Sequence, residues 1–355
     1  MQAVDTIGLV PIHDIEKLAS VEARLGDERA QAELALGPRA HGAPHTAETL
    51  IDMALKRLDG LDALVETRLA TSASAEALPP PTPHRERAAL RGSVLKRKAS
   101  YQARRLLTGR LGEADKRVVS AEMTACLLAA VAAYQSAEGS PGSSQFSPYH
   151  ALNRLALDAL TEWSSPASRD AAIELAQQCR RAAAQGFAIS PSLWDAVTQP
   201  EALLVERLID GSLSLPGDAG RAVFEDVARA YADAMLNVTV KPSQIDAMVS
   251  QMELLSRLCD ALSLAQFDDE ALYRTATRLI DLAQRLQPGR TPRDDRPHRS
   301  APEPTAPARA PRTPASKARV AAAPEKVAAA TAKKPATPAE KKAAAPARRV
   351  KATKR

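Results

Sequence analysis

The sequence predicts an all-α protein in which antiparallel helical hairpins form an array that precedes a disordered, basic tail. Apolar residues recur at helical spacing through the first 287 residues, with no sustained alternating strand pattern. Aromatic residues make up only 3% of the 355 residues, so Leu, Ala, Val and Ile must build the core. From residue 288 onward, 18 Lys and Arg stand against 5 Asp and Glu, whereas the preceding residues carry 30 and 37. An acidic helical body is therefore followed by a cationic segment.

Residues 1–70 are expected to form two N-terminal helices. The first spans 12–36, with Ile12, Ile15, Leu18, Ala19 and Leu25 on one face, and Gly37-Pro38 stops it. The second spans 46–69, and Asp59-Gly60 is a candidate break within it. Residues 71–84 follow as a linker, because consecutive prolines force an extended backbone.

The domain at 85–287 reads as a succession of helices joined by short connections. A Gly/Arg loop is expected at 108–112, and Gly186 is expected to end a helix. Asp268 and Ser243 are candidate N-caps for the last two helices. The last helix carries one continuous apolar stripe, which indicates docking onto other helices. The expected helices span 85–107, 113–137, 149–163, 170–185, one or two in 191–210, 218–236, 243–264 and 268–286.

Two of these segments have the residue spacing of a helical repeat. Leu90, Gly92 and Leu95 lie where the first helix of a tetratricopeptide repeat has Leu, Gly and a bulky residue, and Ala130, Tyr134 and Ala137 match the second helix. The segments "GSVLKRKA", "SPYHALNRLALDAL", "SLWDAVTQPEALLVERLIDGSL" and "SQMELLSRLCDAL", in this order, resemble a bacterial tetratricopeptide-like region. Such regions are commonly found C-terminal to effector domains such as CHAT modules, and they belong with the TRAF-binding regulatory regions of mitogen-activated kinase kinase kinases.

The resemblance covers roughly residues 12–264 and implies a protein-interaction scaffold without catalytic residues. The chain departs from the pattern at Leu95, where the family has an aromatic residue. It also places 61 residues between Gly92 and Asn153, which an inserted loop near 108–118 would explain. Because the chain begins where the helical region begins, we expect any effector domain to be missing or encoded separately. The repeat-packing residues are Leu90, Gly92, Leu95, Ala130, Tyr134, Ala137, Tyr149, Asn153 and Trp194. Trp194 is expected in the core, and Asn153 is expected to bond a neighbouring helix end.

No pattern in the sequence supports catalysis, a cofactor or a metal site. Cys126, Cys179 and Cys259 stand singly in helical patterns, so reduced buried thiols are expected rather than disulfides. His41 and His45 are four residues apart, but Pro44 prevents one helix from placing them on one face. We therefore expect a non-enzyme. The lack of a signal segment and of an apolar run near 18 residues predicts a soluble, cytoplasmic protein.

A cluster of basic residues lies between residues 85 and 110. Two interpretations fit it: the solvated face of a helix, or a local positive surface for a phosphate or an acidic partner helix. The cluster consists of Arg85, Arg87, Arg91, Lys96, Arg97, Lys98, Arg104, Arg105 and Arg110.

The segment 288–355 carries the clearest binding chemistry. Its twelve prolines, abundant alanines and dispersed cations predict disorder, and its composition resembles linker-histone-type tails. No aromatic residue follows Tyr273, so duplex phosphates are the expected polyanion. The expected polyanion-binding residues are Lys317, Arg319, Lys326, Lys333, Lys334, Lys341, Lys342, Arg348, Arg349, Lys351, Lys354 and Arg355. A spacer that binds nothing is the alternative for this segment.

Together these observations predict an adaptor whose body binds a protein and whose tail binds nucleic acid or another polyanion. The alternative function is a nucleoid-associated DNA-binding protein that acts through the tail.

Overall fold

The computed structural model describes residues 12–36, 46–71, 82–161, 165–236, 238–266 and 269–287. Within these ranges every regular element is helical, which confirms the predicted all-α class. The predicted disordered tail at 288–355 and most of the predicted linker lie outside the described residues. The helices are α1 (Ile12–Leu36), α2 (Ala47–Thr71), α3 (Thr82–Leu107), α4 (Glu113–Glu138), α5 (Pro148–Asp158), α6 (Pro166–Ile189), α7 (Leu193–Ile209), the 3-10 helix η1 (Ser212–Ser214), α8 (Gly217–Leu236), α9 (Pro242–Ala265) and α10 (Glu270–Leu286).

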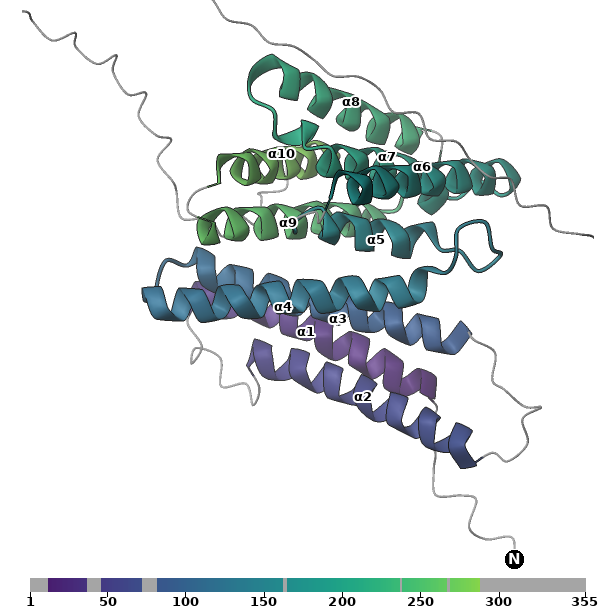
Figure 1. Ribbon diagram of the computed structural model, residues 1–355, viewed down its shortest axis with the longest axis vertical. Helices are drawn as coiled ribbons and strands as arrows, with labels where there is room; N and C mark the ends of the chain where they lie inside the picture. The colour runs from purple at the N-terminus through teal and green to yellow at the C-terminus, as the bar shows by residue number, and fades with distance from the viewer. Residues whose placement is uncertain are drawn as a thin grey trace, which may run out of the picture. The chain divides into compact units, whose positions relative to one another are not determined.

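The helices form hairpins, as Figure 1 shows. The most extensive packing joins successive helices: α1 with α2, α3 with α4, α6 with α7, and α9 with α10. α5 packs against both α4 and α7, and α8 packs against α7. The hairpin arrangement that the apolar spacing predicts is thus present.

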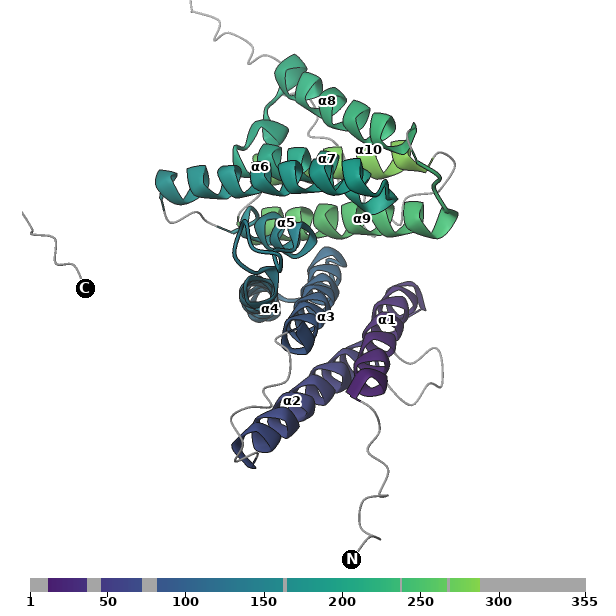
Figure 2. The same ribbon diagram turned by 90° about the vertical axis from the view of Figure 1, so that its right-hand side faces the viewer.

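The array is closed rather than open, because α9 returns to pack against α3 (Figures 1 and 2). Lys96 Nζ of α3 donates to Gln251 Oε1 of α9 at 2.9 Å, and Arg257 Nη1 of α9 donates to Ser100 Oγ of α3 at 2.9 Å. In an open solenoid each repeat contacts only its neighbours. Here two helices about 150 residues apart in the sequence share a buried interface.

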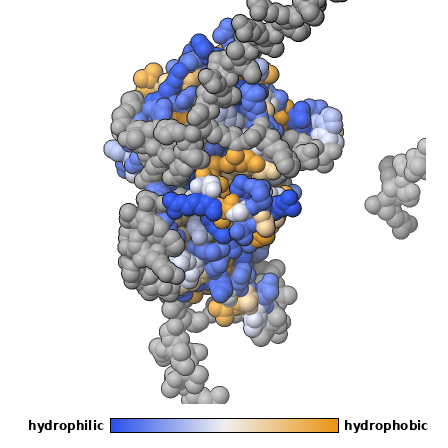
Figure 3. Space-filling model, turned by 90° about the vertical axis from the view of Figure 1, so that its left-hand side faces the viewer, coloured by the Kyte–Doolittle hydropathy of each residue, from blue (hydrophilic) through white to orange (hydrophobic). Residues whose placement is uncertain are grey.

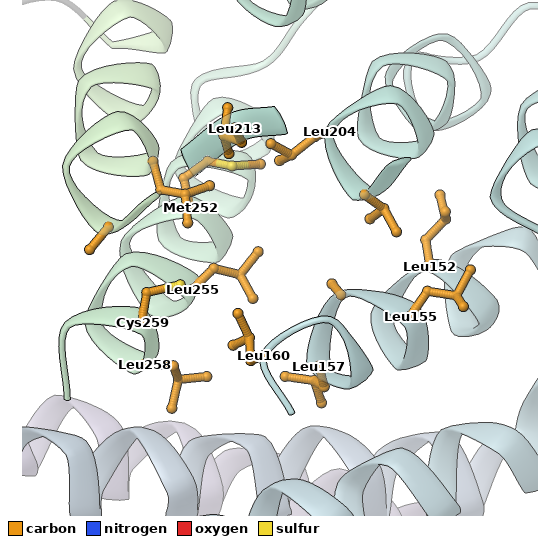
Figure 4. Packing of buried hydrophobic residues seen from close by; sticks show 14 of the residues in the cluster. Leu152, Leu155, Leu157, Leu160, Leu204, Leu213, Met252, Leu255, Leu258 and Cys259 are labelled. Atoms are coloured by element: carbon orange, nitrogen blue, oxygen red, sulfur yellow. The ribbon is translucent and has the colours of Figure 1, made fainter. Parts of the chain in front are cut away.

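A single large apolar core runs through α3 to α10. Figure 4 shows leucines of α5 and of the turn after it facing α7, η1 and α9, where Leu204, Leu213, Met252 and Leu255 meet them. Cys126, Cys179 and Cys259 are free and buried, as the sequence predicts. A second, smaller cluster joins α1 and α2 to α3.

Several predicted boundaries differ from the structure. α2 is continuous through Gly60 and α6 through Gly186, so neither glycine ends a helix. Tertiary packing outweighs the loss of about 1 kcal/mol that a glycine causes in a helix. The N-cap position of α9 is held by Lys241, whose side chain makes no capping hydrogen bond, and that of α10 by Asp269. The predicted N-caps were Ser243 and Asp268.

The expected insertion near 108–118 is also absent, because α4 begins at Glu113. The connection from α3 to α4 has only five residues, at 108–112. The distance in sequence between Gly92 and Asn153 instead reflects the length of α3 and α4, which have 26 residues each.

The buried face of α1 agrees with the predicted one only in part, at Ala19. Leu18 and Leu25 are more than 40% exposed, whereas Ala19, Ala23 and Ala30 are buried. The small alanines let α1 approach its neighbours closely, so the leucines are left on the outer side.

α4 is the one described helix with the length and hydropathy of a membrane span. Core helices of soluble proteins often pass this test, and Met123, Leu127 and Ala130 of α4 are fully buried in the core. Figure 3 shows one face of the molecule, where hydrophobic surface occurs as limited areas among hydrophilic side chains.

Candidate protein-interaction site

The predicted repeat-packing residues of α3 and α4 meet at Gly92. A Cβ atom on Gly92 would lie 2.9 Å from Cδ2 of Tyr134 and 3.0 Å from Cε2, closer than Cβ atoms pack. Tyr134 is itself buried, and so are Ala130 and Ala137 one turn to either side. Leu90 and Leu95 are partly buried. Gly92 therefore leaves the space that the Tyr134 ring occupies.

A buried polar centre lies one turn after Gly92, at Lys96. The Lys96 side chain is only 7% exposed, and its Nζ donates to Asn153 Oδ1 at 2.7 Å and to Gln251 Oε1 at 2.9 Å. The Asn153 Nδ2 donates to the carbonyl of Tyr149 at 2.9 Å. Asn153 thus binds a buried ammonium group, and does not cap a neighbouring helix as expected. The ammonium joins α3, α5 and α9.

The electrostatic environment of this centre shifts the pKa values of one basic and one acidic side chain to about 7. Burial and, to a smaller extent, nearby Arg97 lower the pKa of Lys96 to about 7, against the opposing effect of Glu201 of α7. Burial raises the pKa of Glu201 to about 7, against the attraction of Lys96. The Tyr134 ring centroid lies 5.8 Å from the ammonium. Because Lys96 is buried and donates hydrogen bonds to two amide oxygens, the centre stabilises the packing of the helices that contribute to it.

Sequence reasoning placed Lys96 in the basic cluster rather than in a buried centre, and it did not single out Glu201 or Gln251. Helical spacing does carry a signal for Lys96, because it follows Gly92 by four residues and precedes Ala99 by three, on the buried face of α3. No local pattern marks Gln251 or Glu201, since their role depends on contacts between distant helices.

The basic cluster of α3 is neither a solvated face nor a free positive surface. Arg87 and Arg104 are at most 3% exposed, and both pair with carboxylates of α1 or α2. Arg91 and Lys98 also bind carboxylates of α2. Arg105 Nη1 donates to Gln102 Oε1, and Arg85 Nη1 donates to the carbonyl of Gln145. Among its members, Arg110 is exposed.

A concave surface lies on α7 between α6 and α8. α6 and α8 each pack extensively against α7 but hardly at all against each other, so one face of α7 stays open. The resulting groove has a volume of about 330 Å³. The residues that line it are Arg180 and Phe187 of α6, Ala196, Gln199, Pro200 and Leu203 of α7, and Ala230, Asp233 and Ala234 of α8.

The floor of the groove contains an uncommon helical feature, Pro200 in the middle of α7. Because proline has no N–H, the carbonyl of Ala196 lacks its usual donor four residues on. Ala196 and Pro200 both line the groove. Arg180 lies toward the Leu203 end, where its Nη1 is 3.6 Å from Glu206 Oε1.

Trp194 is not a core residue, contrary to expectation: it is 50% exposed. It lies in the first turn of α7, on a different face from the groove-lining residues Ala196, Gln199 and Leu203. Tyr149 is likewise about half exposed. Near the groove, Ile189 and Leu236 end α6 and α8 and are 86% and 82% exposed.

Within the described ranges, no three His, Cys, Asp or Glu side chains lie close enough to hold a metal ion. His41, His45 and His298 lie outside those ranges.

Comparisons with known proteins found no match: no family model, no curated protein and no solved structure is similar to this chain.

Proposed function

We propose that the helical body is a non-enzymatic protein-interaction scaffold that binds a helical segment of a partner protein in the α6–α8 groove. The observation that carries the proposal is the open face of α7, which two flanking helices frame without closing. The resemblance of residues 12–264 to tetratricopeptide-like regions supports the same class of function. A separately encoded effector is one partner that this class would serve.

The lining of the groove suits a helix. Ala196, Ala230 and Ala234 have small side chains, which let another helix approach closely, while Phe187 and Leu203 provide apolar contacts. Helices bind such grooves through anchors at positions i, i+4 and i+7. Ala196 and Leu203 are themselves seven residues apart, so the groove spans about two helical turns, or roughly 10 Å.

The groove also has opposite charges on opposite walls. Arg180 of α6 lies toward the Leu203 end, and Asp233 of α8 lies toward the other end, because α8 runs antiparallel to α7. A partner helix that carries an acid and a base about two turns apart would complement both walls in one orientation.

A site-specific cross-linking experiment tests this proposal. A photoactivatable amino acid replaces Gln199 of the groove, and the partner that it captures in cells is identified and purified. We expect Ala234→Arg, which fills the groove, to weaken binding of that partner about tenfold or more, a loss of about 1.4 kcal/mol. The control is Ala232→Arg, at an exposed position of the same helix outside the groove lining. Equal binding by the two variants would contradict the proposal.

A second candidate function rests on the composition of residues 288–355. Their excess of 13 positive charges, spread among prolines and alanines, favours sequence-independent binding to a polyanion such as duplex DNA. Under the alternative of a nucleoid-associated protein, the body has no partner of its own. The two functions differ in whether protein binding persists after the tail is removed. Three free thiols fit a reducing compartment such as the cytoplasm.

A further inference from the structure

The α1–α2 hairpin is attached to α3 chiefly by ion pairs. Asp62 Oδ1 accepts from Arg87 Nε at 3.0 Å, and Asp62 Oδ2 accepts from Arg91 Nη2 at 2.7 Å. Asp52 Oδ1 accepts from Lys98 Nζ at 2.7 Å. Further carboxylates on the hairpin pair with the same row of cations: Asp59 with Arg91, Glu16 with Arg87, and Asp27 with Arg104.

The apolar part of this attachment is small. The buried cluster shared by the three helices contains Ala19, Ala23, Ala54, Ile51, Leu58 and Val94, and half of these residues are alanines. It is separate from the large core of α3 to α10. Burial of alanine removes little apolar surface from water. Ion pairs therefore make an unusually large contribution to the docking of the hairpin.

Four of the five carboxylates in these pairs are within reach of water, whereas Glu16 is only 16% exposed and the Arg87 and Arg104 side chains are at most 3% exposed. The side chains of Asp27, Asp52 and Asp62 are 32–40% exposed, and that of Asp59 is 63% exposed. Salt screens the more exposed pairs of Asp52 and Asp59 most, whereas apolar burial does not depend on charge screening. Docking of the hairpin should thus weaken as the salt concentration rises, while the α3–α10 core should not.

The surface of α3 under the hairpin has a definite chemistry. Arg87, Arg91 and Lys98 follow one another at intervals of four and seven residues, on one stripe of α3. Apolar Val94 lies between them, and half-buried Tyr101 follows Lys98 on the same stripe. The partner of such a stripe must present carboxylates interleaved with small apolar residues at helical spacing, which α1 and α2 do.

We propose that this face of α3 is a binding surface for an acidic amphipathic helix of a partner protein, and that the chain's own α1–α2 hairpin covers this surface and competes with the partner for it. Competition follows from the shared chemistry: an incoming helix would replace Asp52, Asp59 and Asp62 with its own carboxylates. The Val94 and Tyr101 contacts favour a helix over nucleic acid, because a phosphate backbone would leave these apolar groups uncovered. This surface is distinct from the α6–α8 groove.

Hydrogen–deuterium exchange of the full chain tests the electrostatic attachment. Between 50 and 500 mM salt, we expect amides of α1 and α2 to exchange about tenfold faster or more, while amides of α9 keep their protection. Arg91→Glu should produce the same opening of the hairpin at low salt. The control is Arg229→Glu, because Arg229 forms an exposed pair with Asp226 within α8. Hairpin amides that stay as protected as those of α9 at 500 mM salt would overturn the proposal.

Competition by a defined probe tests the kind of partner. The probe is a synthetic peptide of residues 47–71, the sequence of α2, added in excess to the full chain. It should speed exchange in the chain's own α1 and α2, whereas a peptide with Asn in place of Asp52, Asp59 and Asp62 should not. Equal action by the two peptides would overturn the proposal. So would opening of the hairpin by a DNA duplex but not by the acidic peptide, which would assign the surface to nucleic acid.

Discussion

Gly92 lies against the flat side of Tyr134, and the missing Cβ atom is what allows α3 and α4 to approach so closely. Gly92→Ala should therefore destabilise the fold by roughly 1–3 kcal/mol through overpacking, although alanine is the better helix former. The matched control is Gly60→Ala in α2, where nothing lies within 4 Å of an added Cβ, so a gain of up to about 1 kcal/mol is expected. Urea denaturation compares the two, and destabilisation of equal size would refute the packing role of Gly92.

Stability should depend on pH through Glu201 and Lys96. The pKa of Glu201 rises from 4.5 to about 7 on folding, so the folded state binds more protons between these values and stability falls as pH rises from 4.5 to 7. The pKa of Lys96 falls from 10.5 to about 7, so the unfolded state binds more protons above pH 7 and stability rises from pH 7 toward 10.5.

The two limbs meet in a shallow minimum of stability near pH 7, from this pair of groups. Glu201→Gln should remove the falling limb, which amounts to roughly 1–3 kcal/mol, and leave the rising limb in place. Denaturant titrations at pH 5, 7 and 9 measure both, with the exposed Glu66→Gln as control. An unchanged difference between pH 5 and pH 7 in the Glu201 variant would contradict this assignment.

The start of α10 depends on Asp269. Its side-chain carboxylate accepts from the backbone N–H groups of Ala271 and Leu272, at 2.8 and 3.1 Å. Asp269→Ala should cost about 1 kcal/mol, and Asp269→Ser, which keeps an acceptor, should cost less. Thermal unfolding followed by circular dichroism distinguishes them, and identical melting temperatures for the two variants would show that the cap is not the cause.

Trp194 should matter little for stability, because half of it is exposed. We expect Trp194→Ala to cost less than about 1 kcal/mol, whereas Leu127→Ala in the core should cost about 2–5 kcal/mol. Urea denaturation followed by circular dichroism gives both values. A cost for Trp194→Ala as large as that for Leu127→Ala would indicate that Trp194 contributes to the core.

DNA binding should reside in residues 288–355. Removing the chain after Gln287 should abolish binding to a duplex, because the remaining residues carry a net charge of −7 and repel the polyanion. If about 6–10 cations of the tail bind phosphates, the affinity of the full chain should fall roughly 10³- to 10⁵-fold between 50 and 200 mM salt. Fluorescence anisotropy titrations measure both, and binding indifferent to salt would exclude this mode.

The sequence was sufficient to predict the helical class and most helices, because apolar spacing and turn residues are local signals. It correctly placed Ala19 of α1 on the buried face but also placed Leu18 and Leu25 there, which are exposed, since choosing between two apolar faces requires knowing which neighbour packs there. Glycine was overestimated as a helix terminator at Gly60 and Gly186, because tertiary contacts outweigh its modest propensity cost.

The candidate interaction sites were less accessible to prediction, for a physical reason. The α6–α8 groove exists because α6 and α8 flank α7 without meeting, and no local sequence pattern encodes that spacing. The sequence shows the acidic residues of α1 and α2, but it does not indicate which of them pair with the basic residues on α3. Charge counts revealed that opposite charges are present, but only the structure pairs Arg87 with Asp62.

The contact between α3 and α9 limits how much of the body can fold while the chain is still being synthesised. The Lys96 ammonium stays without one of its two amide partners until Gln251 has been synthesised, some 155 residues later. An open solenoid can fold unit by unit as it leaves the ribosome, and it tolerates removal of terminal units. This body cannot complete its centre until α9 has emerged, so truncation before α9 should yield chains that fail to fold, rather than a shorter functional array.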